Sequence, residues 1–197
     1  MMQAQQEVVL CKVAEQLSAA NILWALGGSM LLCKNGIVDH SDDIDLILAP
    51  EDAPRADAIL SSLGKKYPRV PTPSYATQFF HRYDIDGVYL TIISGLTLHY
   101  KGFLYRYQFD RDAIVSMQPV GHVYVPCTAL EDWWVLYQMM PDRAERFLAL
   151  DKYMSSHGVR YPERFGKLRR QPLPPAVLAG IRRLGSLAPR QPYAVTC

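Results

Sequence analysis

Residues 26–46 of this chain read LGGSMLLCKNGIVDHSDDIDL, and this stretch decides the fold. The apolar residues 22–26 predict a buried strand that ends in a tight turn at Gly27-Gly28. Residues 29–34 then predict a helix that ends near Asn35-Gly36. Residues 43–49, DIDLILA, alternate acidic with apolar side chains and predict a second strand.

The polar residues of this stretch suit the binding of a metal-bound anion. Gly27 and Gly28 allow a backbone turn that other residues resist, and they let N–H groups at the helix start approach an anion closely. Ser29 adds a hydroxyl donor at the same place. Asp43 and Asp45 share one face of the predicted strand, so their carboxylates repel unless a divalent cation neutralises both. The pattern therefore predicts metal-assisted phosphoryl chemistry.

A Gly-Gly-Ser turn, followed after thirteen residues by Asp-Ile-Asp on a strand, resembles the nucleotidyltransferase fold of the DNA polymerase β superfamily. The small bacterial members are the most similar. The resemblance covers residues 5–110 and, more loosely, the helices to residue 155. It implies an enzyme that transfers a nucleoside monophosphate, AMP in the first place, from a nucleoside triphosphate to an acceptor, using Mg²⁺ or Mn²⁺. The acceptor stays open among a small molecule, a protein and an RNA end.

Carried over residue by residue, the resemblance assigns roles to the two halves of the motif. Asp43 and Asp45 would bind the metal ions and act in catalysis, and Gly27, Gly28 and Ser29 would contact the triphosphate. Taken singly, a Gly-Gly turn is commonly a packing turn, and two acids on a strand are commonly an exposed sheet face. The combination at this spacing favours the fold relationship.

The third acid of the family is absent from its expected place. Active members carry it on a neighbouring strand, where residues 87–95 read GVYLTIISG, and the best-matching position is Thr91. A neutral hydroxyl is a poor substitute for a carboxylate on Mg²⁺, and it cannot act as a general base near neutral pH. The alternative is a catalytically lapsed protein that binds a nucleotide or a partner, for example as an antitoxin. Nearby His81, Arg82 and His99 are interpreted as sheet-surface residues.

The remaining pattern predicts an α+β fold, in which helices flank a mixed sheet and the C-terminal part is helical. Helices are expected over residues 3–20, 51–63, 128–139, 143–154 and 175–184, and strands over 77–83, 88–94, 96–107 and 122–125. Asp86-Gly87 signals a hairpin turn. Thr128 and Glu131 fit the spacing of a helix capping box.

The sequence predicts that the chain has three parts. They are a nucleotidyltransferase-like core at 1–126, a helical segment packed on it at 127–156, and a basic, proline-rich tail with one short helix at 157–197. The net charge of the chain is +2, but the tail holds eight basic residues and one acid, whereas residues 1–156 hold 13 basic and 18 acidic residues. The tail is expected to contact nucleic acid or an acidic partner, or else to fold over the acidic body or stay solvated.

Basic residues of the helical segment are candidates for contacts with the triphosphate. Arg143 is the preferred one, and Arg146 and Lys152 are the others; a solvated helix face is the alternative for each. Trp134 and Tyr137, at helical spacing, are expected in the core.

Composition sets the remaining expectations. Hydrophobic residues are 49% of the chain, which excludes wholesale disorder. No apolar run approaches the roughly 20 residues of a spanning helix, and no secretory signal opens the chain, so the cytoplasm is expected and no membrane partner. The four cysteines are widely separated, without the spacing of a zinc site.

Overall fold

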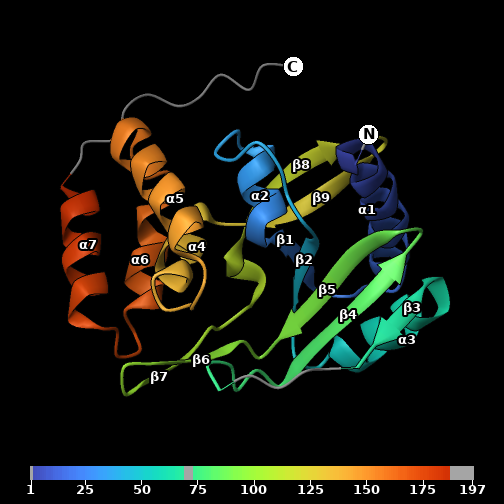
Figure 1. The fold of residues 1–197 in the computed structure, drawn as a ribbon, viewed down its shortest axis with the longest axis horizontal. Helices are drawn as coiled ribbons and strands as arrows, with labels where there is room; N and C mark the ends of the chain where they lie inside the picture. Colours follow the sequence, from blue (N-terminus) through green and yellow to red (C-terminus); the bar gives the residue numbers. More distant parts are fainter. Residues whose placement is uncertain (1, 69–72, 187–197) are drawn as a thin grey trace.

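Within residues 2–68 and 73–186, which the structure describes, seven strands form a mixed sheet at the centre of the protein (Figure 1). The structure is a computed structural model. In spatial order the strands are β3 (Lys65–Tyr67), β4 (Phe79–Ile85), β5 (Val88–Ser94), β2 (Ile44–Leu48), β1 (Trp24–Gly27), β9 (Val123–Thr128) and β8 (Ile114–Val120). Strands β6 (Thr97–Tyr100) and β7 (Phe103–Arg106) form a separate antiparallel ribbon.

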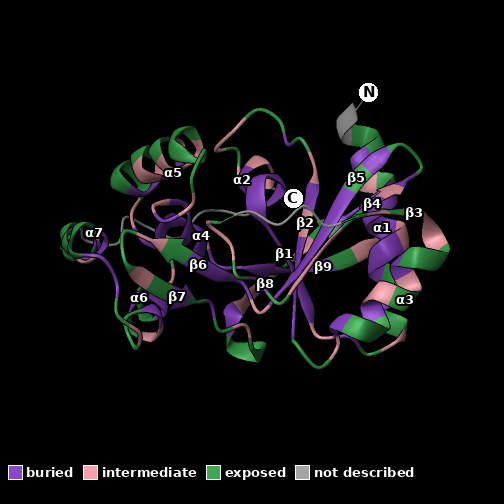
Figure 2. Cartoon of the chain, turned by 60° about the horizontal axis from the view of Figure 1, so that its bottom comes forward, coloured by how far each residue is buried: buried purple, intermediate pink, exposed green. Residues whose placement is uncertain are grey.

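Helices cover both faces of the sheet. Helices α1 (Met2–Ala19) and α3 (Ala53–Leu63) pack on one face, where both contact β5. Helix α2 (Gly28–Lys34) contacts β1 and β2, and it lies on the side of the sheet away from α1 and α3 (Figure 2). Beyond α2 lie α4 (Leu130–Tyr137), α5 (Ala144–His157), α6 (Pro162–Leu168) and α7 (Pro175–Gly185). A 3₁₀ turn, η1 (Arg111–Ala113), precedes β8.

The central strand β2 carries apolar side chains into the core and one carboxylate toward the candidate site. Ile44, Leu46 and Leu48 are fully buried. Because successive side chains on a strand point to opposite faces, Asp45 projects from the other face, toward α2. Strand β2 pairs with β1 in antiparallel fashion and with β5 in parallel fashion, so it is enclosed on both edges and its register is fixed.

The expected α+β fold is confirmed, and the helices α1 and α3 and the strands β2 and β5 lie close to their predicted ranges. Trp134 and Tyr137 are buried, as their helical spacing predicts. No helix in the described part of the chain combines the length and the hydropathy needed to cross a bilayer.

Two local predictions are wrong. The single strand expected over 96–107 is the β6–β7 hairpin, which turns at Lys101 and Gly102, where both backbones adopt positive φ. The capping box is absent, because α4 begins after Ala129 and the hydroxyl of Thr128 donates instead to the carbonyl of Leu26, at 3.0 Å. Glu131 accepts hydrogen bonds from the backbone N–H groups of residues 160 and 161.

The described part of the tail, residues 157–186, contains two helices, α6 and α7, where one was expected. Arg164 of α6 is 3% exposed, and its guanidinium donates to both carboxylate oxygens of Asp132 at 2.8 and 2.9 Å. Lys167 pairs with Asp112, and Arg183 with Asp151. These contacts support the alternative in which the tail folds over the acidic body. Residues 187–197 of the predicted tail lie outside the described residues.

Candidate active site

The two halves of the Gly-Gly-Ser and Asp-Ile-Asp motif are joined by a pair of serine hydroxyls. Ser29, in the first turn of α2, lies 2.7 Å from the hydroxyl of Ser41, Oγ to Oγ. The Ser41 hydroxyl is also 2.6 Å from the carbonyl oxygen of Asp43, and Gln6 of α1 donates to the Ser41 carbonyl at 2.8 Å. Ser29 and Ser41 are both buried. This network therefore fixes the loop that delivers Asp43 to the start of β2.

Asp45 explains why glycine occupies position 28. Gly28 has φ +61°, and a Cβ atom there would lie 2.0 Å from Oδ2 of Asp45. At Gly27 a Cβ would lie 2.1 Å from the indole of Trp133. Each glycine thus makes room for one particular side chain, and no larger residue fits without moving β2 or α4.

Residues of the candidate site lie opposite one another on four neighbouring strands of the sheet. Asp45 of β2 lies opposite Gly27 of β1 and, on its other side, opposite Thr91 of β5. Thr91 in turn lies opposite Arg82 of β4. Paired residues in neighbouring strands point to the same face, so Asp45, Thr91 and Arg82 form one row. The position expected for the third acid is therefore next to Asp45, and a buried threonine occupies it.

Arg82 is a residue of this site that sequence reasoning placed on an ordinary sheet surface. Its Nη2 donates to Oδ2 of Asp43 at 3.1 Å, and its guanidinium carbon lies 4.9 Å from the centre of the Tyr89 ring. The signal for it was present in the sequence. The two-residue turn Asp86-Gly87 fixes the register of its hairpin, and counting back from the turn sets Arg82 opposite Thr91.

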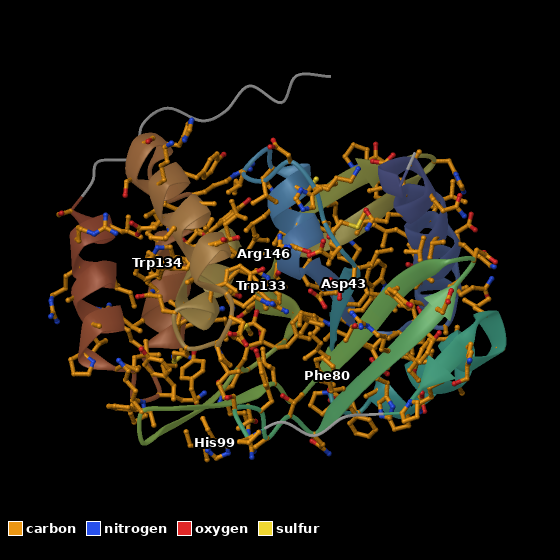
Figure 3. The ribbon with its side chains drawn as sticks, viewed as in Figure 1. Asp43, Phe80, His99, Trp133, Trp134 and Arg146 are labelled. Carbon is orange, nitrogen blue, oxygen red and sulfur yellow. The ribbon has the colours of Figure 1, made fainter. Side chains whose placement is uncertain are left out.

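Two arginines approach the acids from the helical part. Arg146 of α5 donates to Oδ2 of Asp42 at 2.9 Å, and in Figure 3 it lies between α5 and Asp43. Arg143 immediately precedes α5 and also acts electrostatically on Asp45. Lys152, the third basic candidate of this segment, is exposed and is not among the cations that act on Asp45.

Burial and the neighbouring charges together set the pKa of Asp45. Burial raises the pKa of the half-buried Asp45 to about 7, and the negative charge of Asp43 adds to the rise. Arg143, Arg146 and Arg82 act in the opposite direction. Two adjacent carboxylates of which one resists ionisation form an arrangement that a divalent cation stabilises, because the cation compensates both charges.

Tyr137 of the helical part lies within electrostatic reach of Asp45. It is the last residue of α4, it is 3% exposed, and its ring packs on Trp133 with 5.4 Å between ring centres. Burial raises the pKa of its hydroxyl far above the ordinary value, and the charge of Asp45 contributes to this shift. The indole N–H of Trp133 donates to Thr128 at 2.8 Å, which ties α4 to the end of β9.

The donor set fits one divalent cation. Among residues 2–68 and 73–186 no three His, Cys, Asp or Glu side chains gather in a way that would hold a metal ion. Two carboxylates, however, are a sufficient protein contribution for Mg²⁺ when substrate phosphates and water complete its octahedral shell. Asp43 and Asp45 are the residues that would hold it. The roles of Gly27, Gly28, Ser29, Thr91 and Arg143 toward a substrate stay predictions.

Comparison with solved structures identifies the fold. A candidate nucleotidyltransferase (TM1012) from Thermotoga maritima matches with a TM-score of 0.58 and 21% identity, over 79% of this chain and 96% of that chain. The antibiotic-resistance factor ANT(2″)-Ia matches in its solution structure with a TM-score of 0.58 and 15% identity, over 93% of this chain and 94% of that chain. Its crystal structure with adenylyl-2″-tobramycin gives a TM-score of 0.56 and 14% identity, over 91% and 98%. This chain therefore has the nucleotidyltransferase fold. No family model and no curated protein matches its sequence.

Proposed function

We propose that this protein is a nucleotidyltransferase that transfers a nucleoside monophosphate, AMP in the first place, to an acceptor. The observation that carries the proposal is the carboxylate pair of Asp43 and Asp45 at the start of the central strand β2, with Asp45 packed against Gly28. ANT(2″)-Ia, which has a similar fold, has been captured with an adenylylated antibiotic. The acceptor of this chain is a hydroxyl-bearing small molecule, protein or RNA end.

In such a reaction the acceptor oxygen forms a bond to the α-phosphorus of the nucleoside triphosphate. The bond from that phosphorus to the bridging oxygen breaks, pyrophosphate leaves, and the acceptor proton passes to a base. A Mg²⁺ or Mn²⁺ ion held by Asp43 and Asp45 would supply charge neutralisation for the phosphate oxygens. Arg143 and Arg146 lie on the helical side of the same carboxylates, where their guanidinium groups suit contacts with a triphosphate.

One observation favours a second function. Thr91 occupies the place next to Asp45, and its hydroxyl cannot accept a proton as a general base near neutral pH. Transfer would then be slow or absent, and the protein would serve as a nucleotide-binding or partner-binding module. An antitoxin-like role is one form of this alternative.

Radiolabelled ATP separates these functions. Purified protein is incubated with ATP labelled at the α-phosphate, Mg²⁺ and a bacterial lysate divided into small-molecule, protein and RNA fractions. Transfer predicts label in one fraction and its loss with Asp45→Asn. Binding without any labelled product supports the lapsed alternative. Labelling that is equal with Asp45→Asn contradicts both, because the reaction would then not use this site.

A further inference from the structure

Arg82 stands where a second cation would be needed. In two-metal phosphoryl-transfer sites the ions lie about 3.5–4 Å apart and share carboxylate ligands. Here the row across the sheet offers Asp45, then neutral Thr91, and then Arg82. The protein thus lacks the carboxylate for a second ion and carries a fixed positive charge one strand further along the same row.

The guanidinium of Arg82 is held in place on two sides. It donates to Oδ2 of Asp43 at 3.1 Å, and it lies over the ring of Tyr89, which restricts its orientation. Asp43 is the only acceptor that the described residues offer to Arg82. Arginine carries five N–H donors in a planar fork, so further donors stay available to phosphate oxygens.

A second divalent cation at Oδ2 of Asp43 would compete with this arrangement. Such a cation would lie within a few ångströms of a guanidinium that already donates to the same oxygen. Like charges at about 4 Å repel strongly near a protein surface. With Oδ2 of Asp43 accepting from Arg82 and Oδ2 of Asp45 packed against Gly28, the two carboxylates make the protein contribution that one Mg²⁺ commonly takes. The two available carboxylates and the position of Arg82 therefore both indicate a site for a single divalent cation.

We infer that this site takes a single divalent cation, and that Arg82 supplies the second positive charge by binding phosphate oxygens of the nucleoside triphosphate. The inference rests on the proposed function, because it presumes that a nucleoside triphosphate binds at Asp43 and Asp45. Thr91 then serves as a small neutral neighbour that leaves the Arg82 side chain free to face the substrate.

The other interpretation is a surface ion pair between Arg82 and Asp43 with no ligand. The Arg82 side chain is 48% exposed, and exposed ion pairs contribute little to stability. This interpretation predicts that removing the guanidinium changes neither the affinity for nucleotide nor the number of bound cations, so the two interpretations are separated by binding measurements.

The test counts Mn²⁺ ions by electron paramagnetic resonance, in the presence of α,β-methylene-ATP, whose bridging carbon blocks transfer of AMP. The full chain is expected to bind one Mn²⁺ per bound nucleotide. Arg82→Ala should keep one Mn²⁺ and weaken nucleotide binding about 10- to 100-fold, the range of charge-assisted hydrogen bonds. Arg82→Lys should recover part of the affinity, because it restores the charge but not the fork.

Lys12→Ala is the matched control, because it also removes one exposed ion pair, which joins Lys12 of α1 to Asp86 at the turn between β4 and β5. It should change neither quantity. Two Mn²⁺ ions in the unmodified protein, or unchanged nucleotide affinity in Arg82→Ala, would overturn the inference. Thr91→Asp combined with Arg82→Ala is expected to bind a second Mn²⁺. Failure of the proposed function looks different: the unmodified protein would bind no nucleotide, or Asp45→Asn would bind it as tightly.

Discussion

Replacing Gly28 with alanine tests the contact on which the candidate site depends. Two separate penalties apply at this position. The backbone φ of +61° places a non-glycine residue in the left-handed region, which costs about 1–2 kcal/mol. The new Cβ would also lie 2.0 Å from Oδ2 and 2.7 Å from Cβ of Asp45. Moving β2 or α2 apart to relieve this clash costs about 1–3 kcal/mol more.

The sum predicts that Gly28→Ala lowers the free energy of unfolding by about 2–5 kcal/mol, a large part of the roughly 5–15 kcal/mol of an ordinary domain. Gly36→Ala is the matched control. Gly36 has φ +66°, but nothing lies within 4 Å of a Cβ built there, so only the backbone penalty applies. Urea denaturation followed by tryptophan fluorescence gives both values.

The difference between the two variants therefore isolates the close approach of Asp45. Gly28→Ala should also lose Mg²⁺-dependent nucleotide binding, whereas Gly36→Ala should retain it. Equal destabilisation by the two substitutions would refute the reasoning, since it would mean that Asp45 does not lie against Gly28. Wild-type nucleotide affinity in Gly28→Ala would refute it as well.

Three further predictions follow from other contacts. Arg164→Ala should destabilise the protein by about 3–5 kcal/mol in urea denaturation, because it leaves Asp132 charged and buried; a loss below 1 kcal/mol would show that Asp132 is solvated. Ser41→Ala should lower the free energy of unfolding by about 1–3 kcal/mol, because it removes the hydroxyl that joins Ser29 to Asp43, and it should weaken Mg²⁺ binding. Unchanged Mg²⁺ affinity would show that this loop does not position the metal ligands. The pKa of Asp45 is raised from 3.8 to about 7, so the folded protein holds this proton more tightly than the unfolded chain does. The free energy of unfolding is therefore highest below pH 4, where Asp45 is protonated in both states, and it falls as the pH rises to 7. Asp45→Asn should therefore stabilise the metal-free protein at pH 8 by about 1–2 kcal/mol, which is less than the full pKa shift would give because Asp45 is partly solvated. Thermal unfolding in EDTA that shows no increase in stability would contradict this.

The local pattern of residues 26–46 was enough to predict the centre of the fold. Glycines before a helix and acids alternating on a strand are local signals, and the chain obeys them because β1, α2 and β2 are consecutive elements. The neighbour relation between Asp45 and Thr91 is not local, yet it followed from the resemblance to a known fold. Arg82 was derivable from the Asp86-Gly87 turn, since a two-residue hairpin fixes which residues face each other.

Other features depended on contacts between distant parts of the chain. Thr128 occupies a position typical of a helix cap, but its hydroxyl is hydrogen-bonded to Leu26 and Trp133. The local sequence pattern does not predict these partners. Lys101-Gly102 divides the strand expected over 96–107 into β6 and β7, although lysine is an unusual residue at positive φ. The basic tail was interpreted from charge alone, and the partner of its Arg164 is a buried aspartate 32 positions earlier.

The most direct test of the central claim is calorimetric titration with α,β-methylene-ATP in the presence and absence of Mg²⁺. Asp43 and Asp45 are proposed to bind a divalent cation that in turn binds the triphosphate. Binding should therefore be measurable with Mg²⁺, absent in EDTA, and absent with Mg²⁺ in a variant carrying both Asp43→Asn and Asp45→Asn. Binding that is equally tight in EDTA, or unchanged in the double variant, would contradict this role of the two carboxylates.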